Sequence, residues 1–299
     1  MSTVVFLLIG GVSIGALYFL LASGLGLIFG LMRVLSFAHG ALLAACGYAS
    51  WLVVRSADLT TGSTTGAFVL SVVVAVVVGA VLAFLVEYLL IRPLYDRSHL
   101  DQILVTMGFG FLLVALVRGI WGPDEKSVPL PEWLRATTDV GGALIPNDRW
   151  LLIIAAVLLL VAIQLFLRHT RHGLIVRAGV ENREMVRALG IEVRHSFTLV
   201  FVIGGAAAGL GGVLAGAYAR AINPGIGDTF LLFAFIVLIV GGLGSLTGAA
   251  IAAVVIGVLQ QFANFYVDPG AGDILAVVLM AVTLLVRPQG IAGRKERTI

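Results

Sequence analysis

Residues 150–167 read WLLIIAAVLLLVAIQLFL, an apolar run with a single polar amide and no charge. The hydrocarbon core of a bilayer needs about 20 mostly apolar residues in helical form, so this run matches one membrane span. In the whole 299-residue chain, 60% of residues are apolar and 12% are charged, whereas soluble domains carry about 25% charged residues. The mean hydropathy of +1.09 therefore predicts a polytopic membrane protein and excludes almost any soluble enzyme of this size.

Other apolar runs extend this pattern along the chain. They cover residues 4–32, 40–54, 67–91, 102–121, 197–218, 230–267 and 274–286. The run 230–267 is too long for one helix, and the glycine-rich stretch 241–245 divides it. We therefore expect an all-α polytopic integral membrane helix bundle with about eight or nine transmembrane segments and glycine-rich broken helices. Residues 1–299 form a single transmembrane domain in this prediction.

The charged residues between the runs predict the orientation of the chain. The segment 168–195 holds six arginines, and residues 287–297 hold four further basic residues, so the positive-inside rule places both in the cytoplasm. The loop 122–149 carries five acids against three bases and is expected outside. This arrangement puts the N-terminus outside and the C-terminus inside. Because the cations follow membrane orientation, we expect no nucleic-acid partner.

Glycine pairs with GxxxG spacing recur in the apolar runs, where they let two helix backbones approach closely. Tight packing is the commoner reading, and the alternative is an unwound stretch that lines a substrate path. The candidates for such a path are Ser13, Tyr18, Ser36, His39, Gly242, Gly244, Ser245 and Thr247. The chain has no phosphate-binding loop motif and no metal-ligand spacing. We therefore expect it to bind no cofactor.

The longest polar stretch on the predicted cytoplasmic side is 168–196. Its apolar positions recur at roughly helical spacing between Val176 and Leu189, and Gly190 can end a helix. This pattern predicts a short amphipathic helix over 177–189, outside the bilayer. The helix can be a basic element that only enforces topology, or an element that docks a cytoplasmic partner.

Several stretches resemble the permeases of branched-chain amino acid ABC transporters, and the pattern is most similar to the first of their two membrane subunits. These stretches are GLIFGLMRVLSFAHG (26–40), EYLLIRPL (87–94), TMG (106–108), GGLGS (241–245) and RPQG (287–290), together with residues in 177–191. The family more often has asparagine at the position of Ser36. This departure leaves the identity of the transported solute open. Relatives in the wider family carry urea, short amides or other hydrophobic amino acids.

The resemblance implies a non-enzymatic subunit of an importer in the bacterial plasma (inner) membrane. The implied partners are a second, non-identical permease subunit, two ABC ATPases that bind ATP and Mg, and a periplasmic or extracellular solute-binding protein. The loop 168–196 is the implied ATPase-docking loop. The residues expected to dock are Arg177, Ala178, Glu181, Asn182, Met185, Ala188 and Gly190.

Two alternatives stay open beside a permease for branched-chain or other hydrophobic amino acids. One is an ABC permease for urea or short-chain amides. The other is an ion-coupled secondary transporter, which requires ionisable residues near the bilayer midplane. The nearest candidates are Glu87, Arg118 and His39. In the simpler reading Glu87 lies at the membrane interface or pairs with a nearby cation, and amides such as Gln260 bond between helices.

Overall fold

The computed structural model describes residues 2–32, 36–61, 65–95, 97–181, 185–186 and 194–293. Within these residues, seven helical segments are long and apolar enough to cross a membrane. Their helices are α1 (Ser2–Met32), α2 (Ala38–Thr61), α3 (Thr65–Leu85), α4 (His99–Trp121), α6 (Asn147–His169), α9 (Arg194–Ala219) and α11 (Leu246–Tyr266). Two shorter apolar helices are α10 (Ile226–Gly241) and α12 (Ala271–Val286). The fold is the expected all-α polytopic membrane bundle.

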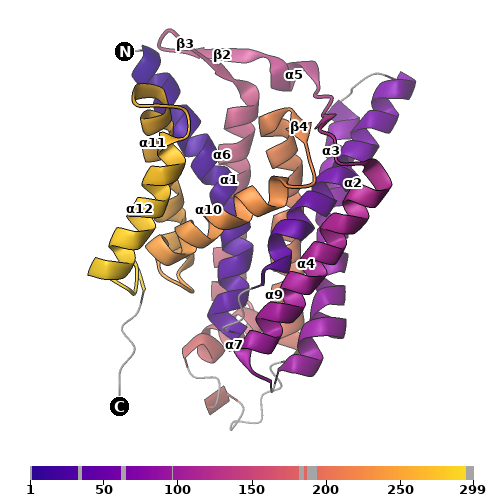
Figure 1. Ribbon diagram of the computed structural model, residues 1–299, viewed down its shortest axis with the longest axis vertical. Helices are drawn as coiled ribbons and strands as arrows, with labels where there is room; N and C mark the ends of the chain where they lie inside the picture. Colours follow the sequence, from indigo (N-terminus) through magenta and orange to yellow (C-terminus); the bar gives the residue numbers. More distant parts are fainter. Residues whose placement is uncertain are drawn as a thin grey trace.

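The two ends of the bundle differ in structure. The antiparallel hairpin of β2 (Thr137–Val140) and β3 (Ala143–Pro146) lies near the start of α1, together with α5 (Glu132–Arg135) (Figure 1). Helix α7 (Arg171–Glu181) lies at the opposite end (Figure 1). We call these the hairpin end and the α7 end. At the hairpin end, β1 (Lys126–Ser127) also pairs with β4 (Ala221–Ile222).

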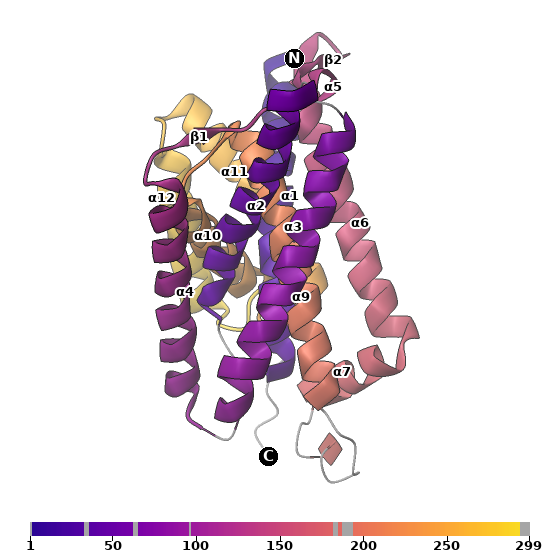
Figure 2. The same ribbon diagram turned by 90° about the vertical axis from the view of Figure 1, so that its right-hand side faces the viewer.

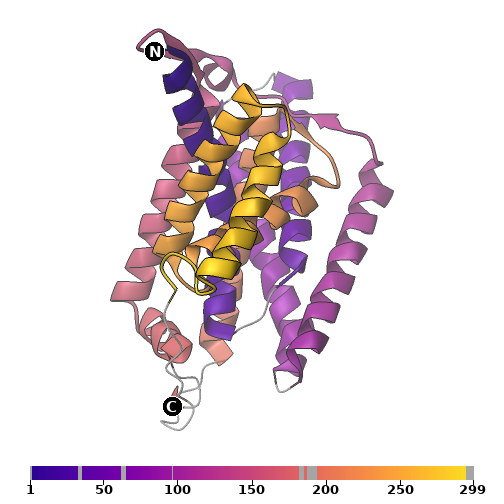
Figure 3. The same cartoon turned by 60° about the vertical axis from the view of Figure 1, so that its left-hand side comes forward.

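Helices α1, α2 and α9 form the centre of the bundle, since they bury the largest shares of their lengths. Helices α4 and α6 bury the smallest shares and stand on opposite sides of the molecule (Figure 2). Helix α11 packs against α1, and α12 lies beside α11 (Figure 3). Helix α10 instead crosses the middle of the bundle obliquely (Figure 1). The apolar surfaces of α4 and α6 suit contact with lipid.

Glycines bring the central helices into backbone contact. A Cβ atom on Gly15 of α1 would overlap with the carbonyl group of Ala253 in α11. Gly205 of α9 and Gly79 of α3 face each other, and a Cβ atom on either would overlap with the other's carbonyl group. These positions confirm the packing reading of the glycine pattern at α1 and α9.

The helix boundaries follow most of the apolar runs. The first run is one continuous helix, and the run 230–267 divides where α10 ends at Gly241 and α11 begins at Leu246. Helix α2 is longer than the expected 40–54, because its backbone hydrogen bonds continue past the apolar residues. The guanidinium of Arg55, just past that run, lies 4.9 Å from the ring centroid of Trp51. Helix α3 continues into the π-helical η1 (Val86–Ile91) and the 3-10 turn η2 (Arg92–Leu94).

Helix α7 begins six residues before the helix that was expected over 177–189. The reason is Thr170, whose Oγ1 accepts a hydrogen bond from the backbone N–H of Gly173 at 2.9 Å and so marks the helix start. A Cβ atom on Gly173 would overlap with the carbonyl of Phe166, so the corner between α6 and α7 is tight. Much of the expected range after Glu181 lies outside the described residues.

Candidate functional site

Helix α7 has one face fixed against the bundle. Its Val176 is buried in a group of side chains from α1, η1, α6 and α9, which we call the α7 cluster. The buried members of this cluster are Leu27, Ile28, Met32, Val86, Ile91, Ile163, Val176, Val186, Phe197, Val200 and Phe201. Arg177, the residue after Val176, is exposed. Helix α7 therefore packs apolar residues inward and presents a charged residue at the surface.

Of the other residues expected to dock an ATPase, Ala178, Glu181 and Met185 are among the described residues. Ala178 is half-buried against the α7 cluster, and Glu181 is the last residue of α7. The side chain of Met185 is 57% exposed, while its neighbour Val186 is buried in the α7 cluster. The remaining expected residues, Asn182, Ala188 and Gly190, lie outside the described residues. The docking role of this segment stays a prediction.

Glu87 in η1 is fully buried, and its carboxylate is surrounded by donors. Arg92 Nε donates to Oε1 at 3.3 Å, and Thr198 Oγ1 donates to Oε2 at 2.9 Å. The hydroxyl of Tyr95 donates to the same carboxylate. Arg92 Cζ lies 4.6 Å from the ring centroid of Tyr88. The expected pairing of Glu87 with a nearby cation is confirmed, and two hydroxyl donors complete the site.

The Glu87 network connects α3 with α9 beside α7. Thr198 lies in the second turn of α9, and Glu87 follows α3 in a π-helical segment, a feature that is frequent at functional sites. Phe197 belongs to the α7 cluster, and its ring packs edge-on against Tyr95 with 5.2 Å between centroids. A displacement of α7 would thus reach α3 and α9 through one connected group of side chains.

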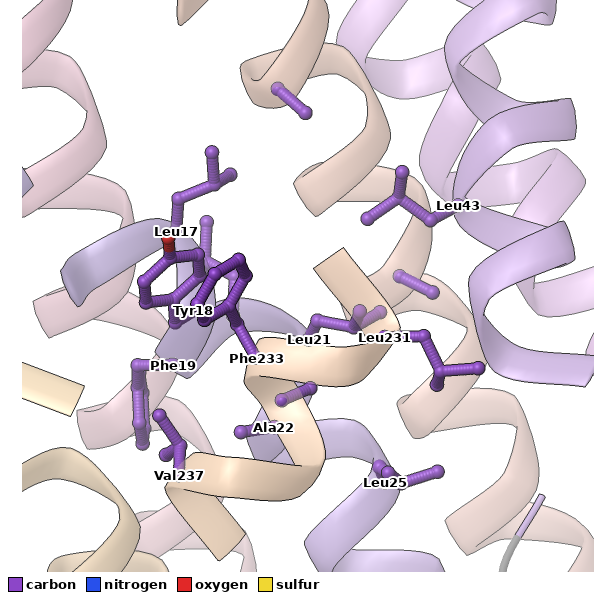
Figure 4. Packing of buried hydrophobic residues seen from close by; sticks show 14 of the residues in the cluster. Leu17, Tyr18, Phe19, Leu21, Ala22, Leu25, Leu43, Leu231, Phe233 and Val237 are labelled. Atoms are coloured by element: carbon purple, nitrogen blue, oxygen red, sulfur yellow. The ribbon is translucent and has the colours of Figure 1, made fainter. Parts of the chain in front are cut away.

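Tyr18 lies in the aromatic core at the crossing of α1 and α10. Its ring stacks on Phe233 with 4.6 Å between centroids (Figure 4). Its hydroxyl donates to Oε1 of Gln260 at 2.7 Å, and Nε2 of Gln260 donates to Oδ1 of Asp273 at 2.5 Å. This chain of hydrogen bonds joins α1, α11 and α12. The expected bonding of Gln260 between helices is confirmed, and a part in a substrate path stays a prediction for Tyr18.

The candidates Ser13, Ser36 and His39 are all buried. Ser13 Oγ donates to the carbonyl of Ile9 in its own helix at 2.6 Å. The backbone N–H of His39 donates to the carbonyl of Ser36 at 3.3 Å, where α2 begins. The His39 ring lies against Gly24, and its Nε2 has no hydrogen-bond partner in the described part of the chain.

The candidates Gly242, Gly244, Ser245 and Thr247 form the turn between α10 and α11. Both glycines have positive φ angles, 102° and 83°, which end α10 and redirect the chain. Ser245 Oγ accepts from the backbone N–H of Gly248 at 3.1 Å and caps α11. The C-terminal segment packs on this turn, since Ile291 N donates to the carbonyl of Val240 at 2.8 Å. Local structure thus accounts for this motif.

The eight substrate-path candidates do not form one site through their polar contacts. Within the described ranges, the hydroxyls of Ser245 and Thr247, 3.4 Å apart, form the one hydrogen bond between two of these side chains. Sequence reasoning missed Asp273, Tyr95 and Thr198. Only Tyr95 carried a local signal, because it lies eight residues after Glu87 on the same turn-rich segment. Among described residues no group of three or more His, Cys, Asp or Glu is placed to hold a metal ion.

Comparisons with known proteins give one family. The model of the family described as branched-chain amino acid transport system / permease component matches residues 7–286. The high-affinity branched-chain amino acid transport system permease protein LivH of Salmonella typhimurium is 29% identical over 296 residues, which cover 96% of this chain and 94% of that protein. The corresponding protein BraD of Pseudomonas aeruginosa is 28% identical, with coverages of 97% and 95%. Among solved structures, PsaBC from Streptococcus pneumoniae in complex with Fab has a TM-score of 0.48 at 12% identity, covering 94% of this chain and 91% of that chain.

Proposed function

Because this chain belongs to the family of permease components of branched-chain amino acid transport systems, we propose that it is the membrane-spanning permease subunit of an ATP-binding cassette importer. The solute is a branched-chain or other hydrophobic amino acid. A second, non-identical permease subunit completes the translocation path. Two ATPase subunits bind ATP and Mg, and an external solute-binding protein delivers the amino acid. In this proposal the chain itself holds no cofactor and catalyses no reaction.

The structure of α7 is the observation that carries this proposal. Val176 and Val186 fix one face of the segment in the α7 cluster, while Arg177 and Met185 are exposed. An amphipathic surface of this kind suits docking to a partner, with the charge at the rim of the contact. Because the α7 cluster includes residues of η1 and α9, ATPase closure that moves α7 would rock these helices and alternate access.

The orientation is part of the proposal. We place the α7 end in the cytoplasm and the hairpin end outside the bacterial inner membrane. Arginines gather in residues 168–177 at the α7 end, whereas the acid-rich loop 122–149 lies at the hairpin end (Figure 1). The positive-inside rule favours this assignment. It puts the start of α1 outside, and α12 runs from the hairpin end toward the cytoplasm (Figure 1).

The experiment is ATP-driven uptake of labelled leucine by the full transporter, with its binding protein, in proteoliposomes. We compare Arg177→Glu with Arg135→Glu, a matched reversal of an exposed arginine at the hairpin end. Arg177→Glu should lower uptake and the recovery of ATPase subunits about tenfold or more, because it reverses a charge in the docking contact. Arg135→Glu should retain at least about half of both, since surface substitutions away from a contact have small effects.

Three outcomes would contradict the proposal. Equal uptake and ATPase recovery in the two variants would remove the docking role of α7. Uptake of urea or a short amide in place of leucine would favour the alternative solute. Uptake that follows an ion gradient without ATP would favour a secondary transporter.

A further inference from the structure

A small pocket at the hairpin end has no role in the function described so far. It lies between α1, β3, the start of α6, the end of α9 and α11. Its polar lining comes from Arg149, Tyr218 and Gln261, and its apolar lining comes from Phe6, Ile145 and Pro146. We call it the hairpin-end pocket. In the proposed orientation it faces the side from which the solute arrives.

Arg149 is held in this pocket by its contact with an aromatic ring. Its Cζ lies 3.6 Å from the ring centroid of Tyr218, so the guanidinium plane is fixed. Its Nη1 is buried and has no hydrogen-bond partner within the described chain. A buried, unpaired donor on a cation is costly. A ligand with an acceptor oxygen would satisfy it.

The chemistry around Arg149 suits the carboxylate of an amino acid. A guanidinium presents paired donors that match the two oxygens of a carboxylate. The side-chain amide of Gln261 lies over Gly10, whose missing side chain leaves it room beside the pocket, and can supply a further donor. The apolar lining can contact an aliphatic side chain.

The neighbouring acid favours a zwitterion over a phosphate. Asp148, the residue before Arg149, is 3% exposed, and its Oδ1 also has no hydrogen-bond partner among the described residues. A carboxylate at this position attracts an ammonium group and repels a ligand with net negative charge. Asp148 and Arg149 are adjacent in the chain, and each has one buried atom without a hydrogen-bond partner in the described ranges, so together they suit the ammonium and carboxylate of a free amino acid better than a lipid phosphate.

We propose that the hairpin-end pocket binds the carboxylate of the incoming amino acid, with Arg149 as the residue that holds it. This inference rests on the proposed function and adds a specific contact at the outer side of the path. The pocket is small, so it takes the carboxylate group while the remainder of the amino acid lies over its apolar rim. A neutral solute such as urea would gain little from this contact.

The test measures the KM and kcat for ATP-driven leucine uptake by the full transporter in proteoliposomes. The variants are Arg149→Gln and Gln261→Glu, the second of which places a competing carboxylate beside Arg149. Loss of a charge-assisted hydrogen bond predicts a KM about 10- to 100-fold higher with a smaller change in kcat. Arg135→Gln removes the same charge from the same end of the bundle outside the pocket, and its KM should stay within about twofold.

The outcomes separate this inference from the proposed function. An unchanged leucine KM in Arg149→Gln, beside an active wild type, overturns the inference and leaves the function standing. A wild type that moves no leucine with ATP overturns both. Vesicles with and without anionic lipid test the other source of an oxyanion, a lipid phosphate. The pocket is assigned to lipid phosphate if leucine uptake by the wild type depends on anionic lipid, if Arg149→Gln abolishes this dependence, and if the leucine KM is unchanged in that variant. Where Arg149→Gln fails to assemble, Gln261→Glu alone decides by the same criterion.

Discussion

Two arginines at opposite ends of the bundle each lie over a tyrosine ring, yet they differ in every other contact. At the α7 end, Arg92 lies over Tyr88 and donates to the carboxylate of Glu87. At the hairpin end, Arg149 lies over Tyr218, and its Nη1 has no partner in the part of the chain that the structure describes. The shared aromatic contact orients both guanidinium groups. Among the described residues, Arg92 forms an ion pair with an acid, Glu87, and Arg149 forms none.

The difference separates a structural role from a binding role. A buried charge that is paired and hydrogen-bonded holds its surroundings in one arrangement, because breaking it leaves an uncompensated charge. An unpaired buried donor contributes little to the resting structure and gains free energy when a ligand arrives. The Glu87 network should therefore control stability and coupling, and Arg149 should control affinity for the solute.

The largest expected effect comes from Glu87→Gln, which removes the buried negative charge. Arg92 would then lack its counter-ion, and because its side chain is 32% exposed, water would compensate part of the loss. We expect the free energy of unfolding to fall by about 2 kcal/mol. Unfolding of the purified chain in mixed micelles with increasing SDS measures this change. Glu132→Gln, at an exposed carboxylate, is the control, and an equal effect in both variants would contradict a structural role for Glu87.

Thr198→Val tests the link from the Glu87 carboxylate to α9. Valine keeps the shape of the side chain and removes the hydroxyl that donates to Glu87 at 2.9 Å. Loss of this hydrogen bond to a charged group should lower the free energy of unfolding by about 1.5 kcal/mol. Thr283→Val is matched, because the Thr283 hydroxyl bonds only to the carbonyl of Leu279 in its own helix among described contacts. An equal decrease in the free energy of unfolding in the two variants would show that the Thr198 hydroxyl stabilises only its own helix, α9.

The apolar runs determine most of the fold that these sites share. A run of about 20 apolar residues specifies a span by itself, and the positive φ angles of Gly242 and Gly244 require the break that divides α10 from α11. Boundaries were less predictable. Helix α7 begins at a cap that depends on the Thr170 hydroxyl, a local contact that hydrophobic spacing does not report.

The polar sites were only partly predictable, for a physical reason. Glu87 and Arg92 are five residues apart on one helical segment, so their pairing follows from local geometry. Thr198 reaches the same carboxylate from 111 residues away, and only the packing of α3 on α9 brings it there. The contact of Arg149 with Tyr218 likewise joins two distant helices.

Tyr18→Phe tests a hydrogen bond between two neutral groups, for comparison with the bonds to the charged Glu87. The substitution keeps the stacking on Phe233 and removes the hydrogen bond to Gln260. We expect a loss of about 1 kcal/mol in the free energy of unfolding, less than for a bond to a charged group. Tyr266→Phe changes an exposed hydroxyl and provides the baseline. A loss equal to that baseline would mean that the Gln260 amide finds another partner without cost.

Arg149→Gln should have the smallest effect on stability in the absence of solute. It removes a cation–π contact worth about 0.5–1 kcal/mol, but it also removes a buried donor that has no partner among the described residues. The two terms oppose each other, so the free energy of unfolding should change by less than about 0.5 kcal/mol. Arg92→Gln, the same substitution in the satisfied site, leaves the fully buried Glu87 carboxylate without its cation and should cost about 2 kcal/mol, as much as Glu87→Gln. The same SDS titration measures both variants, and a larger loss in Arg149→Gln than in Arg92→Gln would reverse the assignment of the two arginines, since it would make Arg149 the structural one.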